Sequence, residues 1–223
     1  MAQRHSGHAR AHADFYTEEP WVPEWLFAHE PFEGPVLDPA CGIGTIPLAA
    51  IEAGLKCRGS DLHDRGYGEA GNDWLDDRCP WRPLIRFPNV VCNPPHGRPL
   101  ARRFVELALE RVSQPAPGKP GGKVAMLLPL QWMAAPGRAD WLLGTPLVRV
   151  WVITRRINFL ANGVPIAPRQ GKERADPSAH HAWYVWQAGA AHDPRLMLMG
   201  EPDELREQSG GGSVRRSAER VAG

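Results

Sequence analysis

The alternation of apolar and polar positions divides most of the chain into helical and extended segments. Apolar residues recur at helical spacing after Glu18 and Pro20, which fit a helix start, and again along 100–112, where polar residues occupy the opposite face. Short apolar runs bounded by Gly, Pro or polar residues indicate strands. We expect helices near 18–26, 45–53, 100–112 and 139–143, and strands at 35–37, up to 61, just before 93, from 123, and over 147–154 and 181–189.

The order of these elements predicts an α/β fold. Strand 35–37, a turn, helix 45–53 and the strand that ends at Asp61 make a βαβ unit. Strands and helices then alternate until a final pair of strands, so we expect a sheet that is parallel at first and antiparallel late. Trp183 and Trp186 lie three positions apart in the last strand and therefore face opposite sides of it, with at least one in the core.

Length and local composition predict one domain with two polar ends. The 223 residues suit a single domain, which we place at 14–200. Residues 1–13 are small, polar and basic and predict a disordered arm, and the Gly- and Ser-rich stretch 201–223 predicts a flexible tail. No window approaches the roughly 18 apolar residues of a membrane span, and the first residues lack the apolar region of a secretory signal. We therefore expect a cytoplasmic protein that does not contact a membrane.

Net charge and the positions of Cys and His give only weak evidence about nucleic-acid and metal binding. The formal net charge of +1 gives no global basic field, which weakens a nucleic-acid interaction without excluding it, because a local basic stripe suffices. The four cysteines form no CxxC pair and no zinc spacing, so we interpret them as reduced thiols. His180 and His181 lack a third ligand at helical spacing, and we expect no metal site.

A glycine-bearing turn, Asp38–Gly44, follows the first strand. Its glycines would let a ligand approach backbone N–H groups at a helix start, and Asp61, about 20 residues on, can accept hydrogen bonds from ribose hydroxyls. Pro47 stands where a dinucleotide-binding turn has its third glycine, and Asp38 adds a negative charge that a pyrophosphate would avoid. The turn therefore fits a cationic adenosyl ligand better. The alternative is a purely structural strand–helix turn.

A second turn, Asn93–His96, follows a later strand, where ligands bind in open α/β sheets. An Asn side-chain oxygen and a backbone carbonyl can each accept one N–H of an amine and so direct its lone pair at an electrophile. Pro94 and Pro95 stiffen the loop and remove competing donors. The preceding Cys92 is better explained by packing.

The two turns together resemble the motifs of class I S-adenosylmethionine-dependent methyltransferases. Asp38-Pro-Ala-Cys-Gly-Ile-Gly44 resembles motif I, and Asn93-Pro-Pro-His96, about 55 residues further on, resembles motif IV of phage-type DNA N6-adenine methyltransferases. The resemblance spans roughly 14–187. It implies a Rossmann-like methyltransferase fold, with a mostly parallel seven-stranded sheet, an antiparallel C-terminal strand, helices on both faces, and 14–200 as the catalytic domain. His96 departs from the motif, where Tyr, Phe or Trp is usual, and the large target-recognition insertion of these enzymes is missing.

Weaker similarities to the same family lie outside the two turns. Phe15-Tyr16-Thr17 with Pro20-Trp21 resembles motif X, which closes over the methionine end of the cofactor, although a helix cap with a hydrophobic staple would look alike. Asp73 resembles the motif III acid that accepts the adenine amino group, although Asn-Asp also forms turns. Arg156 and Phe159 resemble the C-terminal part of the family, where an aromatic residue helps to hold a flipped base; Phe159 would equally suit the core.

The polar stretch 156–179 is longer than typical connections, and such loops are often functional. Arg155, Arg169, Lys172 and Arg174 form either a phosphate-contacting stripe or a solvated loop.

The resemblance implies a set of site residues. The expected catalytic residues are Asn93, Pro94, Pro95 and His96. The expected cofactor-binding residues are Tyr16, Thr17, Asp38, Pro39, Ala40, Cys41, Gly42, Gly44, Asp61, Leu62, Asp73 and Asn93. The expected substrate-binding residues are His96, Arg156 and Phe159.

The resemblance implies that S-adenosylmethionine is the cofactor and that the exocyclic N6 amino group of adenine in DNA, single-stranded or flipped out of a duplex, accepts the methyl group. One alternative keeps the chemistry and changes the acceptor to RNA bases or a protein glutamine amide. A second alternative is a non-catalytic protein that binds the cofactor and docks a partner. The target sequence, the oligomeric state and a restriction partner stay open.

Overall fold

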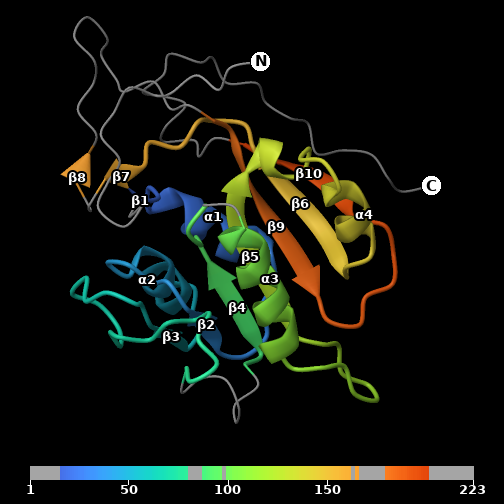
Figure 1. Cartoon of the computed structure of the whole chain (residues 1–223), viewed down its shortest axis with the longest axis horizontal. Helices are drawn as coiled ribbons and strands as arrows, with labels where there is room; N and C mark the ends of the chain where they lie inside the picture. The colour runs from blue at the N-terminus through green and yellow to red at the C-terminus, as the bar shows by residue number, and fades with distance from the viewer. Residues whose placement is uncertain (1–15, 80–86, 97–98, 162–163, 166–178, 201–223) are drawn as a thin grey trace, which may run out of the picture.

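The chain builds one central sheet in a computed structural model that describes residues 16–79, 87–96, 99–161, 164–165 and 179–200. Seven strands follow one another across the sheet in the order β10-β6-β9-β5-β4-β2-β3 (Figure 1). Their bounds are β2 (Val36–Asp38), β3 (Cys57–Gly59), β4 (Asn89–Cys92), β5 (Lys123–Pro129), β6 (Leu147–Ile153), β9 (His181–Gln187) and β10 (Arg195–Met199).

Most neighbouring strands run parallel. The pairs β2–β3, β2–β4, β4–β5 and β10–β6 are parallel, whereas β9 is antiparallel to both β5 and β6. The α/β class and the mostly parallel seven-stranded sheet are thus confirmed. The antiparallel strand, however, is not the last one, because β10 follows it and returns to the parallel direction beside β6.

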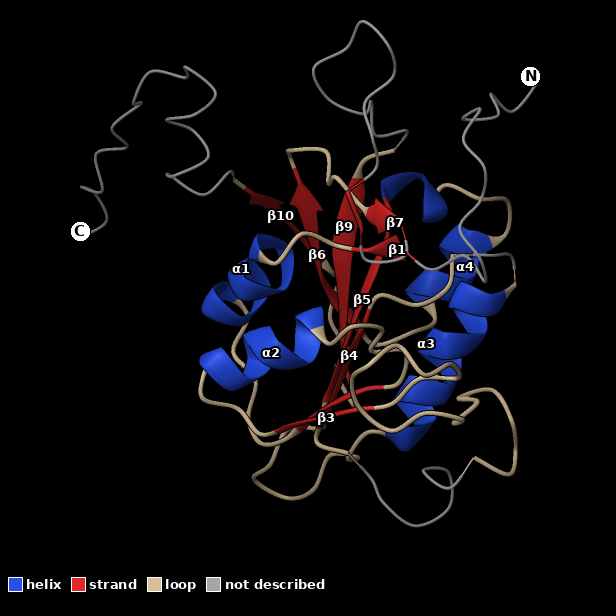
Figure 2. Cartoon of the chain, turned by 90° about the vertical axis from the view of Figure 1, so that its left-hand side faces the viewer, coloured by secondary structure: helices blue, strands red, loops and turns tan. Residues whose placement is uncertain are grey.

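Two helices cover each face of the sheet (Figure 2). Helices α1 (Trp21–His29) and α2 (Thr45–Glu52) lie on one face, and α3 (Leu100–Arg111) and α4 (Arg138–Leu143) on the other. Two core clusters result, one on each side of the strands. Trp183 and Trp186 of β9 are both fully buried and belong to different clusters, which confirms that they face opposite sides.

The first helix starts later than the sequence pattern indicated. Helix α1 begins at Trp21, and Pro20 is its N-cap. Glu18 therefore lies before the helix and is buried, with 4% of its surface exposed. The apolar run from Lys123 likewise ends as a strand at Pro129 and continues as a 3₁₀ turn over Leu130–Trp132.

A small second sheet joins the start of the described chain to a late segment. Strand β1 (Tyr16–Thr17) pairs antiparallel with β7 (Leu160–Ala161), and β7 pairs with β8 (Val164–Pro165). Part of the stretch expected to be a loop is therefore extended. Glu19 adds a further link, because its Oε2 accepts a hydrogen bond of 2.9 Å from the Asn158 backbone N–H.

A buried carboxylate joins the end of α1 to the sheet at the amino end of β5. The Glu30 carboxylate accepts hydrogen bonds from Lys123 Nζ at 2.6 Å, Arg149 Nε at 2.5 Å and Trp151 Nε1 at 3.1 Å. Burial alone would raise the pKa of Glu30, but the hydrogen bonds from Arg149 and Lys123 hold it below its usual value. This carboxylate is therefore a charged, fully paired part of the core.

Several expectations fall outside the described residues: the arm 1–13, the tail 201–223, and Arg169, Lys172 and Arg174. Among the described helices, none combines the length and apolar character that a membrane crossing needs.

Candidate active site

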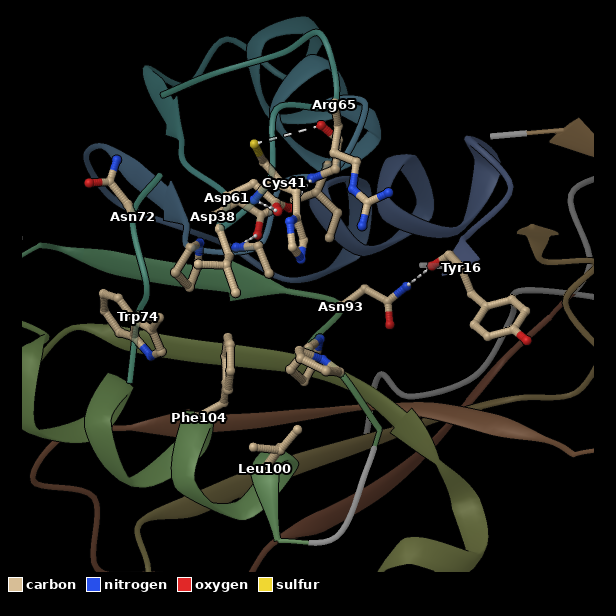
Figure 3. Close-up of a pocket in the computed structure, with 18 of the residues that line it drawn as sticks. Tyr16, Asp38, Cys41, Asp61, Arg65, Asn72, Trp74, Asn93, Leu100 and Phe104 are labelled. Carbon is tan, nitrogen blue, oxygen red and sulfur yellow. Dashed lines mark hydrogen bonds between the residues drawn. The ribbon is translucent and has the colours of Figure 1, made fainter. Parts of the chain in front are cut away.

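A pocket of about 590 Å³ lies at the carboxyl ends of β2, β3 and β4 (Figure 3). The turns that follow parallel strands meet at this edge, so residues distant in sequence come together. The turn after β2 and the turn after β3 form one wall, and Leu100 and Phe104 of α3 form the opposite one. The expected site residues that line the pocket are Tyr16, Thr17, Asp38, Pro39, Ala40, Cys41, Gly42, Asp61, Leu62, Asp73, Asn93, Pro94, Pro95 and His96.

Two carboxylates shape the turn after β2. Asp38 accepts a hydrogen bond of 3.1 Å from the Ala40 N–H, which closes the start of the turn. Asp61 accepts the Gly42 N–H at 3.0 Å with Oδ2 and the His63 N–H at 2.9 Å with Oδ1. One carboxylate therefore links the turns after β2 and β3. Each of its oxygens keeps a second lone pair for a ligand hydroxyl.

Gly44 has a different surrounding from the one expected. It does not line the pocket; it is the N-cap of α2, with φ at 92°. A Cβ at this position would lie 2.5 Å from the ring of Tyr67. The missing side chain thus makes room for the ring of Tyr67.

Negative charge is concentrated on the pocket wall. Glu18, Asp38 and Asp61 are all buried and all line the pocket. Burial raises the pKa of Asp38 well above its usual value, and the charges of Glu18 and Asp61 raise it further against the Ala40 hydrogen bond. Arg65 and His63 bring positive or titratable groups to the same pocket.

These groups fit a cationic adenosyl ligand. Carboxylates crowded in a buried wall are stabilised by a ligand that carries an ammonium or a sulfonium charge. The hydroxyl oxygen of Thr17 is buried and has no hydrogen-bond partner among the described residues, so it is available to a polar group of a ligand. The buried carboxylates and the Thr17 hydroxyl therefore match S-adenosylmethionine in charge and polarity.

Asn93 is held from three sides. Its Nδ2 donates to the Tyr16 carbonyl at 3.1 Å and to Glu18 Oε2 at 2.8 Å. Its Oδ1 lies 3.1 Å from His96 Nε2, which is also 3.2 Å from the Leu127 carbonyl. Both neighbours of this histidine nitrogen are acceptors, so Nε2 carries the proton and donates to them. The Asn93 oxygen therefore faces His96 and the pocket.

The aromatic neighbours of His96 come from late segments. The ring centroid of His96 lies 6.3 Å from Phe159 and 5.5 Å from His181, and Phe159 lies 4.8 Å from His181. Burial and the neighbouring His96 lower the pKa of His181 to about 3, so His181 is neutral. Phe159 thus borders the Asn93 end of the site and is half-buried, whereas Arg156 is exposed beside His180; neither lines the pocket.

Residues 72–75 close the far end of the pocket. Asp73 Oδ1 accepts a hydrogen bond of 2.9 Å from the Leu75 N–H. Asp73 therefore stabilises a turn and also lines the pocket. Trp74 is buried beneath this turn, with the Arg111 guanidinium 3.9 Å from its ring centroid.

Sequence reasoning missed Glu18 as a site residue and assigned it to a helix start. Pro20 is the residue in the sequence that indicates where the helix begins. Proline favours the first turn of a helix, which places Glu18 before the helix and beside the Tyr16-Thr17 segment.

Known proteins match the chain in structure only. No family model matches the sequence, and no curated protein matches it. A protein from Vibrio vulnificus YJ016, assigned as the modification subunit of a type I restriction enzyme, superposes with a TM-score of 0.57 at 20% identity over 85% of this chain. A protein from Pyrococcus horikoshii, assigned as an RNA methyltransferase, gives a TM-score of 0.50 at 14% identity over 77% of this chain and 84% of its own.

The chain has the Rossmann-like methyltransferase fold. It covers 48% of the Vibrio protein and thus spans about half of that protein's length. In this methyltransferase fold the pocket lies where the parallel strands end, which is the usual ligand position in open α/β sheets.

Proposed function

We propose that the protein is an S-adenosylmethionine-dependent methyltransferase whose acceptor is the exocyclic N6 amino group of adenine in DNA. The observation that carries the proposal is the fixed amide of Asn93, whose oxygen faces a pocket with three buried carboxylates on its wall. An amide oxygen is the group needed to hold an acceptor amine, and a carboxylate wall suits a cationic methyl donor.

The turn after β2 and the Asp61 carboxylate would hold the adenosyl part of the cofactor, and Tyr16–Glu18 would border its methionine end. When bound, S-adenosylmethionine supplies an electrophilic methyl group. The Asn93 oxygen and the Pro94 carbonyl would accept the two N–H bonds of the amine, which directs its lone pair and stabilises the positive charge that develops on nitrogen. To reach this position, the amine replaces His96 as the donor to Asn93 Oδ1.

Adenine in DNA is supported by the resemblance of the turns Asp38–Gly44 and Asn93–His96 to motifs I and IV, together with the aromatic rings near Asn93. His96 and Phe159 offer planar rings beside the Asn93 end of the pocket, where a base could stack. A base inside a duplex must first be flipped out, at a cost of a few kcal/mol, and a single strand avoids most of this cost.

The second candidate is methylation of RNA bases. The imidazole at His96, in place of the aromatic residue usual in DNA enzymes, favours it, as does the likeness to the Pyrococcus protein assigned as an RNA methyltransferase.

The test offers the purified protein labelled S-adenosylmethionine together with double-stranded DNA, single-stranded DNA and total RNA, followed by nucleoside analysis. We expect label in N6-methyladenine from DNA. Label in RNA alone would move the acceptor to the second candidate. Cofactor binding without transfer to either polymer would reject nucleic acid as the acceptor and leave a protein glutamine amide or a non-catalytic binder.

A further inference from the structure

We propose that Glu18 is a positioning residue that fixes the orientation of the Asn93 amide, so that the amide oxygen rather than its NH₂ group faces the acceptor. This inference rests on the proposed function, because it assigns the chemistry of Asn93 to an acceptor amine. Glu18 has no motif of its own and lies 75 residues before Asn93. Its assignment comes from three features of the structure.

The first feature is the hydrogen-bond pattern around Asn93. Both N–H bonds of Nδ2 have acceptors, the Glu18 carboxylate at 2.8 Å and the Tyr16 carbonyl at 3.1 Å. If the amide turned by 180°, its oxygen would face these two acceptors and its NH₂ group would face the N–H of His96. The contacts with Glu18 and Tyr16 would then each place one acceptor against another, so this pair of acceptors selects one orientation.

The second feature is the burial of Glu18. Only 4% of the surface of Glu18 is exposed, so its carboxylate forms hydrogen bonds with protein groups rather than with bulk water. Its bond to Asn93 is therefore stronger than the same bond at a surface. Burial raises the pKa of Glu18, and the hydrogen bond from Asn93 opposes that rise. This hydrogen bond favours the ionised carboxylate, both oxygens of which are acceptors.

The third feature is the way the backbone holds Glu18. Tyr16 and Thr17 form β1, which pairs with Leu160 and Ala161 of β7, and Pro20 caps α1 directly afterwards. Glu18 is thus fixed between a strand and a helix, and its side chain reaches Asn93 from a rigid position. The Tyr16 carbonyl is held by the same strand.

The orientation of the Asn93 amide matters for the acceptor amine. An amide that samples both orientations presents its NH₂ group to the acceptor amine part of the time, which is donor against donor. Loss of the Glu18 acceptor should therefore lower kcat at saturating S-adenosylmethionine and raise the KM of the acceptor. Because Glu18 also lines the pocket, loss of its charge should weaken cofactor binding in Glu18→Met and Glu18→Gln alike. A hydrogen bond to a charged group has a strength that corresponds to about 10- to 100-fold in rate.

The experiment compares three variants of the full chain. Glu18→Met keeps the side-chain volume and removes the acceptor, and we expect kcat at saturating S-adenosylmethionine to fall about 10- to 100-fold. Glu18→Gln removes the same charge but keeps an acceptor oxygen, so its kcat at saturating S-adenosylmethionine should stay within about threefold of wild type. Glu24→Gln removes an exposed carboxylate on α1 and serves as the control. Should Glu18→Met not fold, Glu18→Ala replaces it.

Two kinetic results would overturn the proposal. One is a kcat in Glu18→Met close to that of wild type. The other is an equal loss in Glu18→Met and Glu18→Gln, because the charge and not the hydrogen bond would then matter.

A second readout does not depend on turnover. The side-chain amide of Asn93 should give two resolved, slowly exchanging N–H signals by NMR in wild type and in Glu18→Gln, and these signals should shift and exchange faster in Glu18→Met. If wild type transfers no methyl group, the proposed function fails, yet these signals still decide the role of Glu18. Unchanged Asn93 signals in Glu18→Met refute it.

Discussion

Truncation of Asp61 should weaken cofactor binding before it affects catalysis. The Asp61 carboxylate holds the Gly42 N–H at 3.0 Å and the His63 N–H at 2.9 Å. Water can replace the bond to the exposed His63, but the buried Gly42 N–H loses its partner. In Asp61→Ala the turn loses this anchor, and the cofactor ribose loses one or two bonds to a charged acceptor. Each such bond contributes about 1.5–3 kcal/mol, so we expect the Kd of S-adenosylmethionine to rise by about 10- to 100-fold or more.

The assay is calorimetric titration of S-adenosylmethionine, combined with initial rates at saturating cofactor. We expect kcat at saturation to stay within about threefold of wild type. Asp64→Ala is the matched control, because Asp64 is an exposed carboxylate that caps Gly66 and does not line the pocket. An unchanged cofactor Kd with a large fall in kcat would refute the division of roles between Asp61 and Asn93.

Four further predictions follow from contacts in and around the site. Asn93→Ala should lower kcat by at least about 100-fold with little change in the cofactor Kd, since it removes the acceptor of the amine; a parallel loss of cofactor affinity would contradict this role. His96→Phe removes the donor that occupies Asn93 Oδ1, so the KM of the acceptor should fall at least about threefold; a rise would mean that His96 holds the acceptor itself. Glu30→Ala leaves the buried Lys123 and the half-buried Arg149 without their carboxylate and should lower the free energy of unfolding by about 3 kcal/mol at pH 7 in urea titrations; since the pKa of Glu30 is lowered, this contribution is present above the usual glutamate pKa and is lost as the pH falls through the lowered pKa. Gly44→Ala places a Cβ 2.5 Å from the Tyr67 ring at a φ of 92°, and should cost at least about 2 kcal/mol in thermal unfolding; addition of Tyr67→Ala should recover part of the loss.

Local pattern was sufficient to predict the part of the fold that carries the two motif turns. The βαβ unit around Asp38 and Asp61 follows from short buried strands and a glycine turn, which depend on neighbouring residues only. The same local signals placed Asn93 at the end of a parallel strand. Because parallel strands end at one edge of a sheet, the meeting of these residues in one pocket could also be expected.

Features that depend on distant contacts could not be predicted. Glu18 looked like a helix start because acidic residues favour the first turn of a helix, and only the position of Asn93 shows why it is buried. Strand β10 was missed because Leu196 and Leu198 are exposed on an edge strand, where the alternation of buried and exposed positions is weak. Gly44 was assigned to ligand approach because its true neighbour, Tyr67, lies in a polar stretch without periodicity.

The pairing of β1 with β7 has a consequence for the order in which the protein becomes competent during its synthesis. Tyr16 is synthesised about 145 residues before its partner Ala161. At translation rates of about 5–20 residues per second, this interval is roughly 7–30 s. The turn after β2 and the turn that holds Asn93 are therefore synthesised well before β7. Because Tyr16 and Glu18 hold Asn93, and β1 gains its partner only with β7, the anchor of Asn93 is completed only after this late strand has been synthesised.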